Sequence, residues 1–233
     1  MGEGAQKGET DMGSPGTWPE RFPLPCLSVR WQDLRNGVPP VPFPILVECR
    51  LEGFRGSPED LATLLRSLPP TIATCHHPAG GKDPATLLQW ALEAGAGAVD
   101  LDLQAPDETV RKVLPLARAI GARVIRSVHR FEDTPPIEVL RRLARACFDA
   151  GAEIAKVVTM AQSPEDGLRI LDLYQDAPRP LVAFCMGEAG RESRFGSVRR
   201  GAPWLYCTLR PDAPTAPGQP TLEEAARALG MGD

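Results

Sequence analysis

Short apolar runs alternate with helical segments along most of the chain, and this alternation constrains the fold more than any other sequence feature. Eight runs have the residue content of buried strands, and they occupy residues 24–31, 45–50, 71–75, 98–103, 123–128, 151–160, 180–184 and 204–209. Strands that alternate with helices form a parallel sheet. Eight such units predict an α/β protein, a single-domain (β/α)8 TIM barrel whose active site lies at the carboxyl ends of the strands.

Capping residues and prolines mark where several of the expected helices begin. Ser57, Asp83 and Ser163 each precede a proline, which is typical of an N-cap followed by the first helical residue. Other patterned segments predict helices over residues 107–120, 134–149 and 221–229. The helix starts therefore fall between the expected strands, as a barrel requires.

Two segments depart from the regular alternation. Four prolines between residues 39 and 44 exclude a long helix, so a short first crossover is expected. Residues 187–200 are rich in Gly and Arg, and they predict a loop with at most a short helix. A doubly wound open sheet is the rival fold, but the sequence lacks the glycine-rich turn that this fold would require.

The composition is that of a globular protein with an N-terminal extension. Of the 233 residues, 42% are hydrophobic and 24% are charged. Residues 1–22 are rich in Gly, Glu and Pro and predict a flexible tail, whereas residues 23–233 are predicted to form the barrel. The net charge of −4 argues against nucleic acid as a partner. The apolar runs are too short to cross a membrane.

The cysteines suggest a cellular compartment. All six (Cys26, Cys49, Cys75, Cys147, Cys185 and Cys207) lack a C-x-x-C pairing, and several lie in apolar strand or helix patterns. Buried free thiols in a reducing environment are the expected state. The first residues show no apolar core of a secretory signal. We therefore expect a cytoplasmic protein.

Lys156 lies in the middle of the apolar run at residues 151–160. Burial disfavours an ammonium, so the pKa of Lys156 is expected to fall. A neutral lysine amine is a nucleophile toward carbonyl groups. The alternative is that Lys156 lies at the end of its strand and extends its amine to water.

Asp102, His129 and Lys156 stand at an equal interval of 27 residues. Because one βα unit has about this length, we expect the three residues at matching heights on neighbouring strands, with His129 between the acid and the amine. A lysine can form an imine, a histidine can move a proton at the adjacent carbon, and a carboxylate can orient the imidazole. If the interval is accidental, His129 is a capping residue and Asp102 is a solvated one.

Further polar residues fall at the same expected rim. Glu48 and Arg50 share one face of a strand, and arginines in residues 187–194 could bind a substrate carboxylate bidentately. The adjacent pair His76 and His77 could suggest a metal site. However, neighbouring residues of an extended chain point in opposite directions, and no third ligand is evident. Neither a metal nor another cofactor is predicted.

Six segments carry a pattern that is informative as a set: residues 47–50, 99–103, 127–131, 155–158, 186–194 and 215–219. No single one of these motifs is decisive. Together, and in this order, they resemble type I 3-dehydroquinate dehydratase, a Schiff-base enzyme of the shikimate pathway. The resemblance implies a homodimeric barrel that converts the small molecule 3-dehydroquinate into 3-dehydroshikimate and water. A class I aldolase-like enzyme and a silent quinate-binding relative are the alternatives.

The resemblance also implies roles for individual residues. Lys156 would form the imine with the C3 ketone, and His129 would remove the C2 proton and then help water to leave from C1. Arg194 would bind the substrate carboxylate, and Gln219 would help to hold the substrate. The other implied contacts are those of Glu48 and Arg50 with ring hydroxyls and the packing of Met186.

Three positions differ from the family pattern. Asp102 stands where the family has glutamate, and His76 stands where it has arginine. Thr215 replaces a serine and keeps the hydroxyl. We hypothesise that His76 supplies a positive charge near the substrate carboxylate when its imidazole is protonated. Alternatively, His76 only caps the loop that follows its strand.

Overall fold

The computed structural model describes residues 18–34, 37–212 and 214–231. The described part contains eight strands: β1 (Leu24–Arg30), β2 (Leu46–Arg50), β3 (Thr71–Thr74), β4 (Ala98–Asp102), β5 (Arg123–His129), β6 (Ile154–Met160), β7 (Leu181–Met186) and β8 (Trp204–Cys207). Its α-helices are α1 (Pro58–Arg66), α2 (Pro84–Glu93), α3 (Asp107–Ala119), α4 (Ile137–Asp149), α5 (Pro164–Leu171), α6 (Arg191–Arg199) and α7 (Leu222–Ala228). Two 3-10 helices complete it, η1 (Trp31–Leu34) and η2 (Asp172–Gln175).

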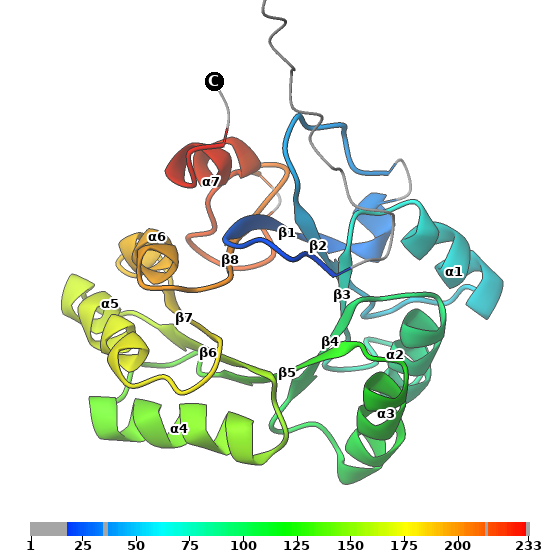
Figure 1. Ribbon diagram of the computed structural model, residues 1–233, viewed down its shortest axis with the longest axis horizontal. Coiled ribbons are helices and arrows are strands. Elements are labelled where there is room, and N and C mark those ends of the chain that lie inside the picture. The colour runs from blue at the N-terminus through cyan, green and yellow to red at the C-terminus, as the bar shows by residue number, and fades with distance from the viewer. Residues whose placement is uncertain (1–17, 35–36, 213, 232–233) are drawn as a thin grey trace, which may run out of the picture.

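All eight strands are parallel and form one sheet in the order β7-β6-β5-β4-β3-β2-β1-β8. The pairing of β1 with both β2 and β8 bends the sheet back on itself, and β7 and β8 are the two ends of the order. The result is a nearly closed barrel with the helices arranged around its outside (Figure 1). This confirms the predicted TIM barrel, including its short first crossover, which begins with η1 in place of an α-helix.

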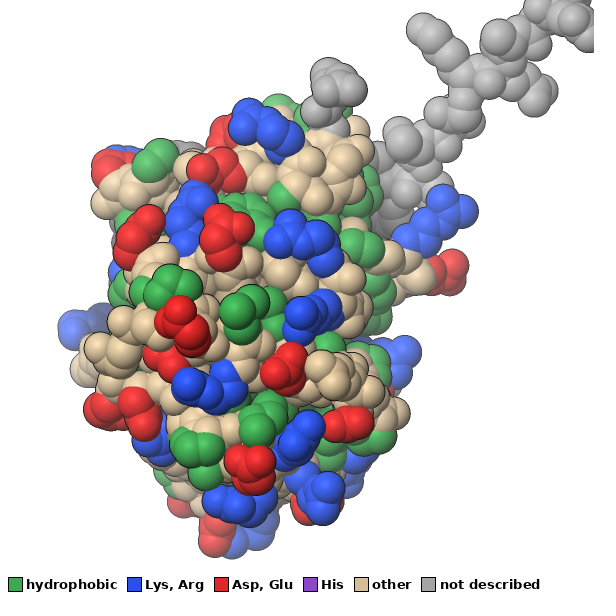
Figure 2. All heavy atoms as spheres, turned by 90° about the vertical axis from the view of Figure 1, so that its left-hand side faces the viewer, with side chains coloured by type: hydrophobic (Ala, Val, Ile, Leu, Met, Phe, Trp, Pro, Cys, Tyr) green, Lys and Arg blue, Asp and Glu red, His purple; other side chains and the backbone are tan. Residues whose placement is uncertain are grey.

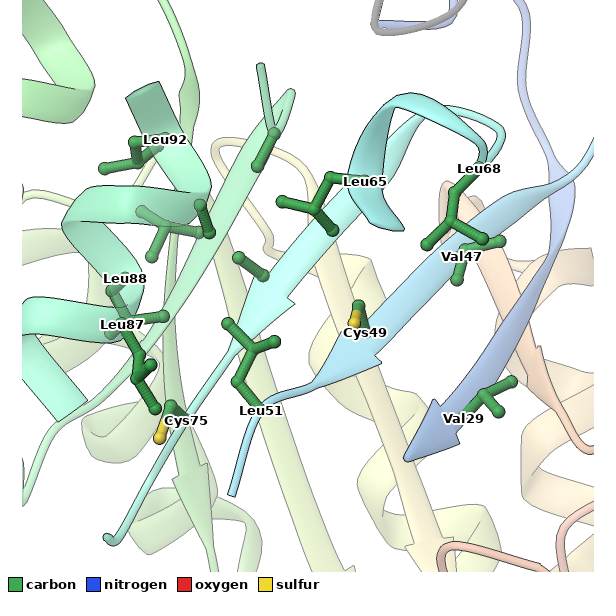
Figure 3. Close-up of a cluster of buried hydrophobic side chains, with 14 of the residues drawn as sticks. Val29, Val47, Cys49, Leu51, Leu65, Leu68, Cys75, Leu87, Leu88 and Leu92 are labelled. Carbon is green, nitrogen blue, oxygen red and sulfur yellow. The ribbon is translucent and has the colours of Figure 1, made fainter. Parts of the chain in front are cut away.

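Residues alternate between two sides of the barrel wall, as the period of a strand requires. The outward side chains pack under the helices; Figure 3 shows Val47 and Cys49 of β2 close to Leu65 and Leu68 of α1 and the loop after it. Inward apolar side chains form a separate cluster, whose members at the amino-terminal part of the strands include Leu46, Ile72, Ala98, Ile125 and Ile154. Each fully buried aliphatic side chain contributes about 1.5–3 kcal/mol. The polar inward residues described below lie nearer the carboxyl ends.

The helix starts follow the caps expected from the sequence. Ser57 and Ser163 form capping boxes with Asp60 and Asp166, and the Asp83 side chain accepts a hydrogen bond from the Thr86 amide. Each such cap stabilises its helix by roughly 1 kcal/mol. These caps fix the residue at which each of the three helices begins after its strand.

One helix differs from the expectation. Helix α4 begins at Ile137 without a side-chain cap, and the Thr134 hydroxyl instead donates to the Met160 carbonyl of β6 at 2.8 Å.

The loop expected over residues 187–200 contains the short helix that the sequence allowed, which is the nine-residue α6. Packing of α6 against β7 overrides the low helix propensity of its glycine and serines.

The expected N-terminal tail is only partly described, since its residues 1–17 lie outside the described ranges. Within residues 18–22, the rings of Trp18 and Phe22 lie 6.1 Å and 6.3 Å from that of Trp204, which is the first residue of β8. Trp204 itself is almost fully buried. These rings extend the apolar cluster inside the barrel at the amino-terminal end of its strands.

The surface carries charges of both signs, and the thiols are in the state expected from the sequence. On the face in Figure 2, basic and acidic side chains are interspersed and form no large area of one sign. No helix in the described ranges is long and apolar enough to span a membrane. All six cysteines are buried and free, which confirms their predicted state.

Candidate active site

The side chains of chemical interest come from the carboxyl-terminal parts of the strands and point into the barrel. Asp100 and Asp102 share the inward face of β4, and Lys156 lies between Ile154 and Val158 on the inward face of β6. These residues are two positions apart on each strand, so the period of a strand places them on one face. The opposite faces of the same strands pack beneath the helices.

Lys156 is buried and contacts two carboxylates. Its Nζ lies 2.9 Å from Asp100 Oδ2 and 3.0 Å from Glu48 Oε1, and it lies 4.6 Å from the centre of the Tyr206 ring. The exposed fraction of each of the three charged side chains is 5% or less. Lys156 therefore does not extend to water, so the alternative of a lysine at a solvated strand end is wrong.

The predicted fall in the pKa of Lys156 is also wrong. Burial acts to lower this pKa, but the charges of Asp100 and Glu48 outweigh it and raise the pKa well above its ordinary value. Burial likewise acts to raise the pKa of Glu48, but Lys156 and Arg50 lower it to about 2. The resting state is thus an ammonium held between two carboxylates.

We expect Asp100→Asn to destabilise the protein by about 1.5–3 kcal/mol near neutral pH, because it removes a charged hydrogen-bond partner from a buried ammonium. Burial opposes ionisation of Asp100, but Lys156 and His76 hold its pKa well below the usual value. A depressed carboxyl pKa stabilises the fold above the unfolded pKa of about 3.9, and this contribution is lost as the pH falls through the folded pKa.

Urea unfolding should therefore show a constant difference between wild type and Asp100→Asn from about pH 5 to pH 8, which shrinks below about pH 4. The exposed Asp149, at the end of α4, offers a matched control. Asp149→Asn should change the free energy of unfolding by less than about 0.5 kcal/mol. If both substitutions changed the free energy of unfolding equally, Asp100 would not stabilise the protein through its contact with Lys156.

His129 and Asp102 form the second pair at this end of the barrel. His129 Nδ1 lies 2.9 Å from Asp102 Oδ2, and the Gln104 amide donates to Asp102 Oδ1 at 2.8 Å. Asp102 therefore reaches the histidine although it is one methylene shorter than the glutamate of the family pattern. Burial lowers the pKa of His129 below its ordinary value, against the opposing effect of Asp102. An imidazole that is neutral and donates from Nδ1 carries its lone pair on Nε2 and can act as a base.

The equal interval does not place the three residues at the same height, so this prediction is wrong. In the ladders, Asp102 pairs with Ser127, and Lys156 pairs with the same Ser127. His129 lies two residues further along β5, opposite Val158. The acid and the amine are thus level, and the imidazole stands above them toward the rim.

His76 lies in the loop after β3, close to these groups. Its ring centre is 5.1 Å from that of His129, and its Nε2 is 3.8 Å from Asp100 Oδ1. Burial acts to lower the pKa of His76, but Asp100 outweighs it and raises that pKa above the ordinary value. Its neighbour Arg50 forms an ion pair with Glu52 at 3.1 Å.

Arg194 in α6 is buried without an acidic partner in the described part of the chain. Its guanidinium lies 4.3 Å from the centre of the Phe184 ring, and its Nη2 donates to the Pro217 carbonyl at 2.9 Å. Burial lowers the pKa of Arg194 to about 9, and its Nε has no hydrogen-bond partner among the described residues. A bound anion would satisfy such a group. Met186 is buried in the same inward cluster as Phe184.

The loop after β8 is tied to the lysine by a chain of hydrogen bonds. Gln219 Oε1 accepts from the Thr215 amide at 2.9 Å. The Thr215 hydroxyl lies 3.0 Å from Gln219 Oε1 and 2.8 Å from the Ser28 hydroxyl, and it can donate its one proton to either. Ser28 donates to Glu48, which contacts Lys156. The predicted residues Thr215 and Gln219 therefore reach the site through the folded loop.

Sequence reasoning missed two residues that contact Lys156. Asp100 stands two residues before Asp102 on one strand, and this parity could have identified it as a second inward carboxylate. Tyr206 lies in an apolar run with no distinguishing pattern. The structure also brings His76, Asp102 and His129 together as a group that could hold a metal ion.

The fold and the site define a TIM barrel with a buried lysine between carboxylates and a neutral histidine oriented by an aspartate. The inward polar layer lies at the end of the barrel where active sites of this fold occur. The chain belongs to the type I 3-dehydroquinase family, whose model matches residues 44–232. This confirms the resemblance inferred from the six sequence segments.

Individual relatives agree with the assignment to this family. A 3-dehydroquinate dehydratase from Pyrococcus abyssi is 43% identical over 124 residues, which cover 53% of this chain and 56% of the relative. The chain thus spans just over half the length of that relative. A 3-dehydroquinate dehydratase from Syntrophobacter fumaroxidans is 35% identical over 205 residues, which cover 79% of this chain and 85% of the relative.

The fold is similar to that of solved structures. A type I 3-dehydroquinate dehydratase from Clostridium difficile, described with covalently modified comenic acid, matches with a TM-score of 0.73. The match covers 89% of this chain and 91% of the other at 21% identity. At this identity the similarity concerns the fold.

Proposed function

We propose that the protein dehydrates 3-dehydroquinate to 3-dehydroshikimate through an imine on Lys156. The observation that carries the proposal is the buried Lys156, paired with Glu48 and Asp100, next to a neutral His129 oriented by Asp102. The membership of the family supports the same reaction. A nucleophilic amine and an acid–base group are the two components that an imine-based elimination requires.

The proposed reaction begins with transfer of a proton from the Lys156 ammonium to one of its carboxylate partners, Glu48 or Asp100. Nζ then attacks the C3 carbonyl, whose oxygen leaves as water with this proton and one from Nζ, and a protonated imine forms. His129 takes the C2 proton, and the electrons of the C–H bond move into the imine to give an enamine. When they return, the C1 hydroxyl leaves with a proton from His129 as water. Hydrolysis of the imine consumes one water, releases the product and restores the amine.

Contacts with the rest of the substrate are also part of the proposal. Arg194 would bind the carboxylate, since it is a buried cation whose Nε has no hydrogen-bond partner among the described residues. His76 would add a second positive charge when protonated, and the raised pKa supports this role. The further proposed contacts are Glu48 and Arg50 with ring hydroxyls, Met186 by packing, and Thr215 and Gln219 from the loop.

Addition of 3-dehydroquinate to the purified protein should produce a growing ultraviolet absorbance, because the product conjugates a new C=C bond with its carbonyl. The expected result is turnover that depends linearly on the concentration of protein. Heat-unfolded protein at the same concentration serves as the control. Absence of turnover by protein with an intact helical circular dichroism spectrum would contradict the proposed function.

The family resemblance is further the basis for proposing a homodimer that acts in the cytoplasm. Six buried thiols without a disulfide support a reducing compartment. Light scattering should give a mass of twice 25.1 kDa in solution. A monomeric mass at all accessible protein concentrations would contradict the dimer.

A further inference from the structure

We propose that His76, Asp102 and His129 form a binding site for a divalent transition-metal ion, with Zn²⁺ as the ion best suited to it. Occupancy of this site would inhibit the enzyme by capturing His129. The binding claim stands on the geometry and the donor chemistry. The inhibition claim rests on the proposed function.

The three side chains already lie close together. One ligand atom of each residue lies within 4.8 Å of the other two. His129 and Asp102 are in hydrogen-bond contact at 2.9 Å, and the rings of His76 and His129 are 5.1 Å apart. Ligands of one tetrahedral zinc ion, bound at about 2.0–2.2 Å, lie roughly 3.3 Å from one another. A contraction of about 1–1.5 Å by side-chain rotation would therefore complete the geometry.

The donor set selects the class of ion. Two imidazoles and one carboxylate suit Zn²⁺ and its neighbours in the transition series, whereas Ca²⁺ and Mg²⁺ prefer oxygen ligands alone. Three protein ligands leave a fourth position for water. The side chains of the three residues are between 14% and 18% exposed, so an ion can reach them from the open end of the barrel.

The surrounding charges favour a dication. Among the described residues, the carboxylates of Glu48, Asp100 and Asp102 interact with the same cluster of groups. The fixed cations that interact with these carboxylates are Lys156, Arg50 and Arg126. Glu52, which pairs with Arg50 and accepts from the His76 amide, is a fourth carboxylate beside them. Four carboxylates thus face three fixed cations, and a cluster that is net negative favours an added cation.

The most direct indication of a bound ion is found at His76. Its Nε2 is buried and has no hydrogen-bond partner in the described ranges, although Asp100 stands 3.8 Å away. A buried polar atom without a partner requires an explanation such as a water or an ion. An arginine at this position, as in the family pattern, could not coordinate a metal because a guanidinium offers no lone pair. The site is therefore a consequence of the histidine in this chain.

A metal ion at this site would compete with catalysis. Coordination uses a lone pair of His129, and it draws Asp102 away from its role as the partner of the imidazole. The histidine could then no longer accept the C2 proton. Zn²⁺ would thus lower kcat, and a chelator would restore it.

The binding claim is tested on purified protein without an affinity tag, dialysed against a chelator. Isothermal titration should show one Zn²⁺ bound per chain, and Co²⁺ should give visible d–d bands without thiolate charge-transfer absorption. His76→Arg and His76→Gln should weaken binding by more than the roughly 10–100-fold that loss of an outer-shell partner causes. His77→Gln, at the exposed adjacent position, is the matched control and should bind Zn²⁺ as the wild type does.

Retention of wild-type affinity by both His76 variants would overturn the site, as would thiolate absorption in the cobalt spectrum or the absence of stoichiometric binding. The inhibition claim is tested by the ratio of rates with and without Zn²⁺, each variant being compared with its own metal-free rate. That ratio should fall for wild type and His77→Gln and stay near one for His76→Arg. A protein that binds Zn²⁺ as described but never turns over 3-dehydroquinate would leave the site standing and overturn the proposed function.

Discussion

Substitution of Lys156 by methionine should reduce the rate of dehydration by about 10⁶-fold, the scale of loss seen when a covalent nucleophile is removed. Methionine has a similar length but cannot form an imine. Borohydride added together with 3-dehydroquinate should fix a covalent adduct on Lys156 in the wild type, and mass spectrometry should find none in the variant. An unmodified Lys156 under conditions of turnover would contradict the mechanism.

The control for this experiment must separate chemistry from stability. Lys156→Met leaves Glu48 and Asp100 without their common partner, and removal of one member of a buried ion pair costs about 3–5 kcal/mol. Circular dichroism and urea unfolding should therefore accompany the rate measurement. Lys112→Met, at an exposed position that forms an ion pair with Glu108, should retain both activity and fold.

Substitution of His129 by alanine should reduce turnover by about 10²–10⁴-fold, the range for a positioned acid–base group. Because Lys156 keeps its own partners, Glu48 and Asp100, formation of the imine should survive in part. Borohydride should still trap an adduct on Lys156 while release of product is suppressed. This separation of trapping from turnover is the signature of a group that moves the proton.

One result for His129→Ala would contradict the role proposed for this histidine. Turnover near the wild-type rate would mean that another residue, such as His76, takes the C2 proton. His77→Gln is again a suitable control, since this residue is exposed and adjacent to His76 in the sequence. It should leave both the trapped adduct and the rate unchanged.

The fold could be predicted from the sequence because its signals are local. Ser57 and Ser163 mark helix starts with a cap and a proline, and the structure forms capping boxes at both. The alternation of inward and outward residues around Lys156 also follows from the period of a strand. For α6 the sequence indicated only a short helix somewhere within residues 187–200, because the stability of this helix comes from packing against β7.

The state of Lys156 could not be predicted in the same way. Its partners Asp100 and Glu48 stand 56 and 108 residues earlier, and only closure of the barrel brings them to its amine. Burial alone would lower the pKa of Lys156, whereas its two carboxylate partners raise it. The prediction of equal heights from the 27-residue interval failed for a related reason. Asp102 and Lys156 both pair with Ser127, and His129 lies two residues further along β5. Spacing along the chain therefore did not determine height in the barrel.

The pairing of Lys156 with two carboxylates also determines which molecules the resting protein ignores. An ammonium has no lone pair, so we expect aldehydes, acylating agents and other electrophiles to leave Lys156 unmodified in the ligand-free protein. A molecule that takes over the contacts of Glu48 and Asp100 would release the proton and expose the nucleophile. The ion pair would thereby act as a chemical safeguard that ties the reactivity of the lysine to the binding of the proposed substrate.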